Sequence, residues 1–102
     1  MPDRRVFGRV KVNFPLRFLN RISGDEEHAQ VVDISAGGLG FVTEKPIAIN
    51  TPLELWLNIP DRHLPFYTKG DVALTWPSLD GCQHRVGVRF EKPELMGLAR
   101  IL

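Results

Sequence analysis

Strict alternation of apolar and polar side chains is the feature that most limits how this chain can fold. Every second residue from position 10 to position 18 is apolar, in the order Val10, Val12, Phe14, Leu16 and Phe18. A period of two places successive side chains on opposite faces, so this stretch is predicted to be a half-buried β-strand. Pro15 falls on the polar face and has no N–H to donate to a neighbouring strand. We therefore expect the strand to lie at a sheet edge or to carry a bulge at Pro15.

Five more stretches have strand patterns and are separated by short segments rich in turn-forming residues. They cover residues 29–34, 39–43, 53–59, 71–76 and 85–90. Within 71–76, Val72, Leu74 and Trp76 share one parity, so all three are expected to face the core. Six short strands with no helix between them predict an all-β fold, a six-stranded antiparallel β-barrel.

The last ten residues change their period. Pro93 suits the first position of a helix, and an i, i+3, i+4, i+7 apolar spacing follows at Leu95, Leu98, Ala99 and Leu102. A short C-terminal α-helix is therefore expected to cover one opening of the barrel. The whole chain is predicted to be one domain, with a flexible arginine-bearing arm at 1–9, the barrel at 10–91 and the helix at 93–102.

Charge is distributed unevenly along the 102 residues, although the net charge is only +1. The first 21 residues hold six basic side chains and one acidic side chain, a balance of +5. The remaining residues hold seven basic and eleven acidic side chains, a balance of −4. A basic segment on a nearly neutral body suits a compact anion better than a long polyanion, so no DNA partner is expected.

Cysteine content and hydropathy bear on where the chain works. Cys82 is the only cysteine, which excludes an internal disulfide and agrees with a reducing compartment. No apolar stretch is long enough to span a bilayer, and the N-terminus leads into no secretory signal. The expected location is the cytoplasm, without membrane insertion.

Enzyme chemistry finds little support in the sequence. The three histidines are dispersed, and Cys82 with His84 supplies two metal ligands where zinc needs three or four. No histidine is placed as a base for Ser35, and no phosphate-binding glycine loop is present. We predict that the chain is not an enzyme and has no catalytic residues, no metal site and no cofactor.

Three arginine pairs have the spacing RxxxR. They are Arg5 with Arg9, Arg17 with Arg21, and Arg85 with Arg89. Two guanidiniums on one face make a good clamp for phosphates or for the edge of a guanine. The spacing alone means little, since nine arginines in this chain produce about one such pair by chance.

A rarer motif, DxSxxG, spans residues 33–38. The composition of the chain produces it by chance only about 0.015 times. Asp33 and Ser35 are expected to cap a tight turn between two strands, with glycine supplying a positive φ. The same turn can present ligand groups, because the carboxylate of Asp33 can accept from the N–H edge of a guanine and the hydroxyl of Ser35 can donate to a phosphate.

The ordered pair of motifs, RxxxR followed about twenty residues later by DxSxxG, resembles the PilZ family, whose members bind the bacterial second messenger cyclic di-GMP (c-di-GMP). The likeness continues through residues 31–41, 72–76 and 86–90 in the expected order. The family pair precedes the first barrel strand, which selects Arg5 and Arg9 and sets the other two pairs aside. The resemblance implies c-di-GMP binding by Arg4, Arg5, Arg9, Asp33, Ser35 and Gly38.

Further implications concern stoichiometry and signalling. Arginine at position 4 implies that the ligand binds as an intercalated dimer. Gly37 and Trp76 are additional candidates, Trp76 by stacking on a base or a guanidinium as an alternative to its place in the core. We expect the arginine-bearing arm to fold across the DxSxxG surface when c-di-GMP neutralises it, and the barrel to relay this change to a downstream protein that the sequence does not identify.

Two other functions stay open. One is a small barrel that holds single-stranded nucleic acid, which requires aromatic side chains on an exposed strand face. Most aromatic residues here have the apolar parity, and Trp56 is the exception. The other is a PilZ-like barrel that serves only as a protein-interaction module.

Overall fold

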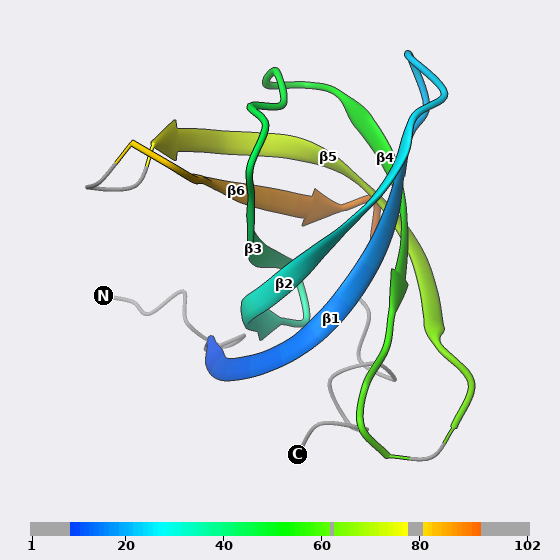
Figure 1. Cartoon of the computed structure of the whole chain (residues 1–102). Helices are drawn as coiled ribbons and strands as arrows, with labels where there is room; N and C mark the ends of the chain where they lie inside the picture. Colours follow the sequence, from blue (N-terminus) through cyan, green and yellow to red (C-terminus); the bar gives the residue numbers. More distant parts are fainter. Residues whose placement is uncertain (1–8, 62, 78–80, 93–102) are drawn as a thin grey trace, which may run out of the picture.

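The computed structural model describes residues 9–61, 63–77 and 81–92, which form a closed barrel of six antiparallel strands (Figure 1). The strands succeed one another around the barrel in the order β1-β2-β3-β6-β5-β4, and β4 closes against β1. This confirms the six-stranded antiparallel barrel. The helix expected over 93–102 and the arm up to residue 8 lie outside the described residues. In chain order the strands are β1 (Val10–Asn20), β2 (Glu26–Ser35), β3 (Gly38–Thr43), β4 (Pro52–Leu57), β5 (Phe66–Pro77) and β6 (His84–Phe90).

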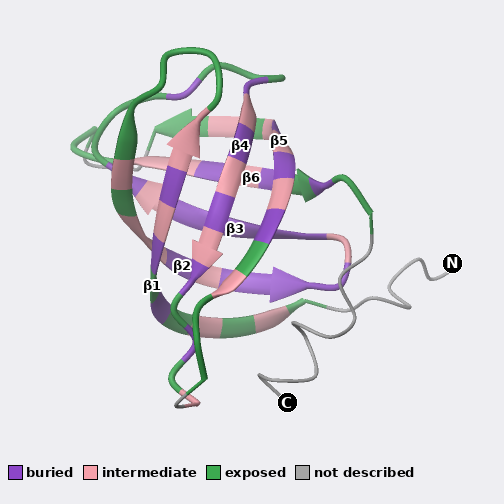
Figure 2. Ribbon diagram, turned by 90° about the vertical axis from the view of Figure 1, so that its right-hand side faces the viewer, coloured by how far each residue is buried: buried purple, intermediate pink, exposed green. Residues whose placement is uncertain are grey.

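The barrel interior is filled by the inward-facing apolar residues of every strand. Figure 2 shows buried segments alternating with partly and fully exposed ones along the strands. The rings of Phe18 and Phe41 meet with centroids 5.2 Å apart, and Leu53, Leu55 and Leu57 are completely buried. Burial of this apolar surface is the main force that holds the closed sheet together.

Two strands begin earlier than the sequence patterns predict. β2 starts at Glu26 and β5 at Phe66, because in both strands the residues before the predicted start still pair with a neighbouring strand. Glu26 pairs with Leu19 on β1, and Phe66 pairs with Leu57 on β4. Long-range pairing therefore lengthens strands whose ends carry no alternating pattern of their own.

Three irregularities in register interrupt the ladders. One lies in β1 between Lys11 and Phe14, one in β2 between Val31 and Asp33, and one in β5 between Val72 and Leu74. In β2 and β5 the extra residue changes the phase of the inside–outside alternation beyond it. In β1 the alternation continues unchanged, with Lys11 exposed and Phe14 buried. Pro15, expected at a sheet edge or a bulge, lies just beyond the irregularity of β1.

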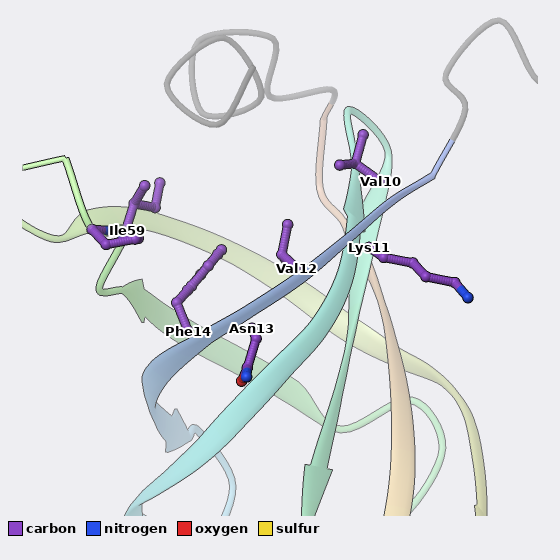
Figure 3. Close-up of a pocket in the computed structure, with 7 residues that line it drawn as sticks. Val10, Lys11, Val12, Asn13, Phe14 and Ile59 are labelled. Atoms are coloured by element: carbon purple, nitrogen blue, oxygen red, sulfur yellow. The ribbon is translucent and has the colours of Figure 1, made fainter.

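Among the described strands, β1 has a neighbour on both sides only in its second half. Its pairing with β4 starts at Leu16, and the carbonyl of Pro15 accepts one further bond from Asn58 N–H at 3.0 Å. Before this point a cleft of about 330 Å³ lies beside the strand (Figure 3). Figure 3 shows Val12 and Phe14 on one side of β1 and Asn13 on the other. Pro15 thus sits where one edge of β1 becomes unpaired, a position that tolerates its missing N–H.

Candidate functional site

Asp33 reaches the outer face of the barrel because of the bulge in β2. Val31 pairs with Phe41 and both are buried in the core, whereas Asp33 pairs with Gly40 on the other side of the sheet. The extra residue between these pairs, Val32, reverses the phase of the strand. Without it, Asp33 would share the inward parity of Val31.

Two guanidiniums meet on the carboxylate of Asp33. Arg9 Nη1 lies 2.5 Å from Oδ1, and Arg85 Nη2 donates to Oδ2. The side chain of Asp33 is 11% exposed, while those of Arg9 and Arg85 are 55% and 42% exposed. One carboxylate therefore neutralises only one of two cations, and their outward N–H groups form a positively charged surface beside it. Such planar forks suit oxyanions and the acceptor edge of guanine.

Trp76 lies beside this cluster on the outer face. It pairs directly with Arg85 across β5 and β6, and the Arg85 guanidinium carbon is 5.8 Å from the centroid of its ring. Trp76 is 45% exposed and Leu74 is 56% exposed, so the predicted core positions of these two residues are wrong. The bulge between Val72 and Leu74 is the physical reason, because beyond it the side chains expected to face the core face outward instead.

The DxSxxG turn joins β2 to β3 next to the cluster. The hydroxyl of Ser35 accepts from Gly37 N–H at 3.3 Å and donates to the carbonyl of Gly38 at 3.4 Å, so it caps the turn as expected. The positive φ expected of its glycines is not found, since only Gly24 and Gly81 among the described glycines have one. Gly38 is required for another reason: a Cβ there would lie 2.1 Å from the carbonyl oxygen of Val88.

The structure thus brings together most of the residues that sequence reasoning singled out. Arg9, Asp33, Ser35, Gly37 and Gly38 lie at one end of β2 and β3, and Trp76 reaches the same face from β5. Arg4 and Arg5 lie outside the described residues. We call the outer face of β2, β3, β6 and the second half of β5 the site wall. Its chief residues are Asp33, Gly40, Arg85, Gly87 and Trp76.

The model of the family described as PilZ domain matches residues 3–101. This chain belongs to the PilZ domain family. No curated protein sequence matches it.

Solved structures share the fold at low sequence identity. The inhibitor of motility MotI/DgrA of Bacillus subtilis superimposes with a TM-score of 0.78 at 15% identity, over 99% of this chain and 49% of that one. The PilZ domain of YcgR from Escherichia coli with c-di-GMP has a TM-score of 0.71 at 16% identity, over 97% and 88%. The MrkH–c-di-GMP complex of K. pneumonia has a TM-score of 0.71 at 18% identity, over 99% and 50%. This PilZ domain spans about half the length of MotI and MrkH.

Arg85 is the site residue that sequence reasoning set aside. Motif order selected Arg5 and Arg9 and excluded the pair Arg85 and Arg89, yet Arg85 binds the same carboxylate as Arg9 from 52 positions away. A signal was present, because Arg85, Gly87 and Arg89 share the polar parity of β6. Parity shows which face a residue occupies, but not which strand lies next to it.

The opposite side of this PilZ domain carries a second aromatic cluster. Arg17 lies over the ring of Trp56 at 4.1 Å from its centroid, and Trp56 and Tyr67 lie with centroids 5.2 Å apart. Arg17 also binds the carboxylate of Glu26, and Tyr67 donates to Glu54 at 2.8 Å. We call this outer face of the second half of β1, β4 and the first half of β5 the balanced wall, because its two arginines each lie beside a glutamate, Arg17 beside Glu26 and Arg21 beside Glu54.

Metal and membrane chemistry receive no support from the residues described. Within residues 9–61, 63–77 and 81–92, no three His, Cys, Asp or Glu side chains are grouped so that they could hold a metal ion. Over the same part of the chain, no helix is long and apolar enough to cross a membrane.

Proposed function

We propose that this PilZ domain is a receptor that binds c-di-GMP on its site wall. The observation that carries the proposal is the carboxylate of Asp33 flanked by the guanidiniums of Arg9 and Arg85. A guanine presents two kinds of N–H donor on one edge and two acceptors on another, and the phosphates of the ligand are anionic. Acceptor and donors at the site wall are complementary to these groups.

We include in the proposal an exchange of partners at Asp33. Both oxygens of its carboxylate accept from arginine and the side chain is only 11% exposed, so two guanidiniums leave little room and the N–H edge of a guanine takes the place of one of them. The released arginine then turns to a phosphate or to the acceptor edge of the base. The attraction between Asp33 and the arginines keeps the site ordered before binding and lowers the affinity by the free energy needed to break one contact.

Arg4 and Arg5 extend this clamp in the proposal. They precede Arg9 on the same segment, and Arg9 already reaches Asp33. Together they supply cations for the two phosphates of a c-di-GMP molecule, or for the four phosphates of an intercalated dimer. Ser35, Gly37 and Gly38 shape the turn beneath the ligand, and Trp76 offers an exposed ring for stacking.

The relay to a partner depends on the same segment. The first half of β1 borders the site wall and pairs with β2 alone among the described strands, so it is the neighbouring segment that can move most easily. Ligand binding fixes Arg9 and the residues before it, and the changed surface is what a downstream protein recognises.

Single-stranded nucleic acid is the second candidate, because the balanced wall does expose Trp56 and Tyr67 on a strand face. Its two arginines nevertheless each lie beside a carboxylate: Arg17 binds Glu26, and Arg21 lies 3.7 Å from Glu54. These two arginines therefore add no surplus positive charge for a polyanion, and we favour c-di-GMP.

Calorimetry with three ligands tests the proposal. We expect c-di-GMP to bind more tightly than GTP, because the site matches both halves of the cyclic molecule, and a short oligonucleotide to bind weakly. Equal affinity for GTP and c-di-GMP would contradict the proposal. Tight binding of the oligonucleotide with a steep salt dependence would favour the nucleic-acid function instead.

A further inference from the structure

A row of five directly paired residues runs from β1 across the site wall, and its third and fourth members are glycines. Lys11 pairs with Asp33, Asp33 with Gly40, Gly40 with Gly87, and Gly87 with Leu74. The strands of Asp33 and Leu74 are three strand spacings apart, about 14 Å. The glycines thus leave bare backbone between an acidic side chain and an exposed leucine.

The two glycines differ in what lies above them. A Cβ at Gly40 would lie 3.1 Å and 3.2 Å from the two carboxylate oxygens of Asp33, so this carboxylate leans over Gly40 and buries it. A Cβ at Gly87 would meet only the side chain of Leu74, at ordinary contact distances of 3.5 to 3.9 Å. Gly87 also has no positive φ. The barrel itself therefore has room for a larger residue at position 87.

Glycine in the interior of a strand weakens it, since alanine loses less backbone entropy on folding. Glycine inside a strand can mark a bulge, a tight bend of a barrel, or close approach of another molecule to the backbone. Gly87 lies opposite the β5 bulge, but its φ is not positive and a Cβ fits there, so the bulge does not require glycine. Gly87 is partly exposed, and its neighbours on the outer face of β6 are Arg85 and Arg89. The open floor is therefore bordered by two arginines along the strand and by Asp33 and Leu74 across it.

These borders select the kind of group that fits. An anion directly on the floor would face the carboxylate of Asp33, and the backbone N–H groups of β6 lie in the sheet between two paired strands. A flat ring with N–H donors on one edge and an apolar body matches the acid at one end and Leu74 at the other. Arg89, and Arg85 once the ring has replaced it on Asp33, then bind the phosphates attached to the ring.

We propose that Gly87 is the floor of a purine subsite, in which a guanine lies flat on the bare backbone of β6 with its N–H edge on Asp33 and its opposite side against Leu74. This inference rests on the proposed binding of c-di-GMP, and it assigns one guanine of that ligand to the surface over Gly87. Adenine has no N1–H and no 2-amino group, and its N1 is an acceptor that would face the carboxylate, so the same place discriminates against it.

Substitutions of increasing size at position 87 test the floor. Gly87→Ala should melt at the same temperature as the unaltered protein or higher, and should bind c-di-GMP at least tenfold more weakly, because the methyl group occupies the space of the ring. Gly87→Val should bind more weakly still. Ala48→Val adds bulk at an exposed loop position away from the site wall and should leave the affinity unchanged.

A second measurement locates the base directly and does not depend on any variant. In NMR spectra of the unaltered protein saturated with c-di-GMP, the Hα resonances of Gly87 should move upfield, since they lie beneath an aromatic ring. Tight binding by a folded Gly87→Ala protein, or binding without a shift at Gly87, would contradict a guanine subsite over Gly87 and leave the c-di-GMP proposal intact. Failure of the unaltered protein to bind c-di-GMP would overturn both.

Discussion

The site wall and the balanced wall each carry an arginine stacked on a tryptophan at directly paired positions. On the balanced wall Arg17 pairs with Trp56, and on the site wall Arg85 pairs with Trp76. The guanidinium carbons lie 4.1 Å and 5.8 Å from the ring centroids, respectively. The same two residue types therefore form the same kind of contact on both sides of one barrel.

The walls differ in counter-charge. Arg17 binds the exposed carboxylate of Glu26 and shares it with no other described arginine, whereas Arg85 shares the nearly buried carboxylate of Asp33 with Arg9. The first arrangement is electrically satisfied and the second keeps a surplus positive charge. The two arginine–tryptophan contacts thus do not distinguish the walls, and the balance of charge around them does.

The largest expected difference between the walls is in the effect of removing one arginine on c-di-GMP affinity. Arg85→Ala is expected to weaken c-di-GMP binding by roughly 2 kcal/mol, about thirtyfold, because charge-assisted hydrogen bonds are lost. Arg9→Ala should have a similar effect, and Arg17→Ala should change the affinity by no more than about 0.3 kcal/mol. Calorimetry measures all three. If Arg17→Ala and Arg85→Ala proved equally damaging, the site would not be confined to one wall.

Asp33→Asn tests whether the carboxylate shared by Arg9 and Arg85 also binds guanine. The amide presents a donor to the N–H edge of guanine, so affinity is expected to fall at least tenfold, equivalent to about 1.4 kcal/mol. Stability should fall by about 1 kcal/mol or less, since water can solvate both half-exposed guanidiniums. Urea unfolding and calorimetry separate the two effects. Unchanged affinity in the folded variant would mean that the carboxylate does not bind guanine.

The two tryptophans should separate ligand binding from stability. Trp76→Ala is expected to lower c-di-GMP affinity by about 1 kcal/mol through lost stacking. Trp56→Ala should instead lower the free energy of unfolding by about 1 kcal/mol, since its ring packs between Arg17 and Tyr67, and should leave affinity unchanged. In the Trp56→Phe protein, quenching of the remaining fluorescence on ligand addition would report Trp76 alone. Absence of quenching at saturation would place the ligand away from Trp76.

The smallest expected effect is a titration on the balanced wall. The pKa of Tyr67 is raised, first because its hydroxyl donates to the carboxylate of Glu54 and then because of partial desolvation. Glu54→Ala should lower this pKa toward its ordinary value, and Glu26→Ala should not. Tyr67 is the only tyrosine, so the absorbance of tyrosinate against pH reports it directly. Saturation with c-di-GMP should leave the pKa of Tyr67 unchanged. A shift of this pKa would show that ligand binding also alters the balanced wall.

Local pattern alone predicted much of this molecule. The alternation along β1, β4 and β6 was sufficient to identify strands and core, because period two is a property of each strand by itself. The turn at residues 33–38 was equally evident, since the Ser35 hydroxyl bonds backbone atoms only two and three positions away. Asp33, also expected to cap the turn, instead binds arginines 24 and 52 positions away. The ordered motifs also pointed to the family that the comparison confirms over residues 3–101.

Only the tertiary structure decided which residues meet on the site wall. The bulges in β2 and β5 depend on how each strand matches its neighbours, and a single extra residue moved Asp33, Leu74 and Trp76 to the outer face. Pairing of β3 with β6 then brought Arg85 to Asp33 and placed Gly87 beside Gly40. Register and closure are set by the packing of the whole barrel core, so no stretch of sequence taken alone carries that information.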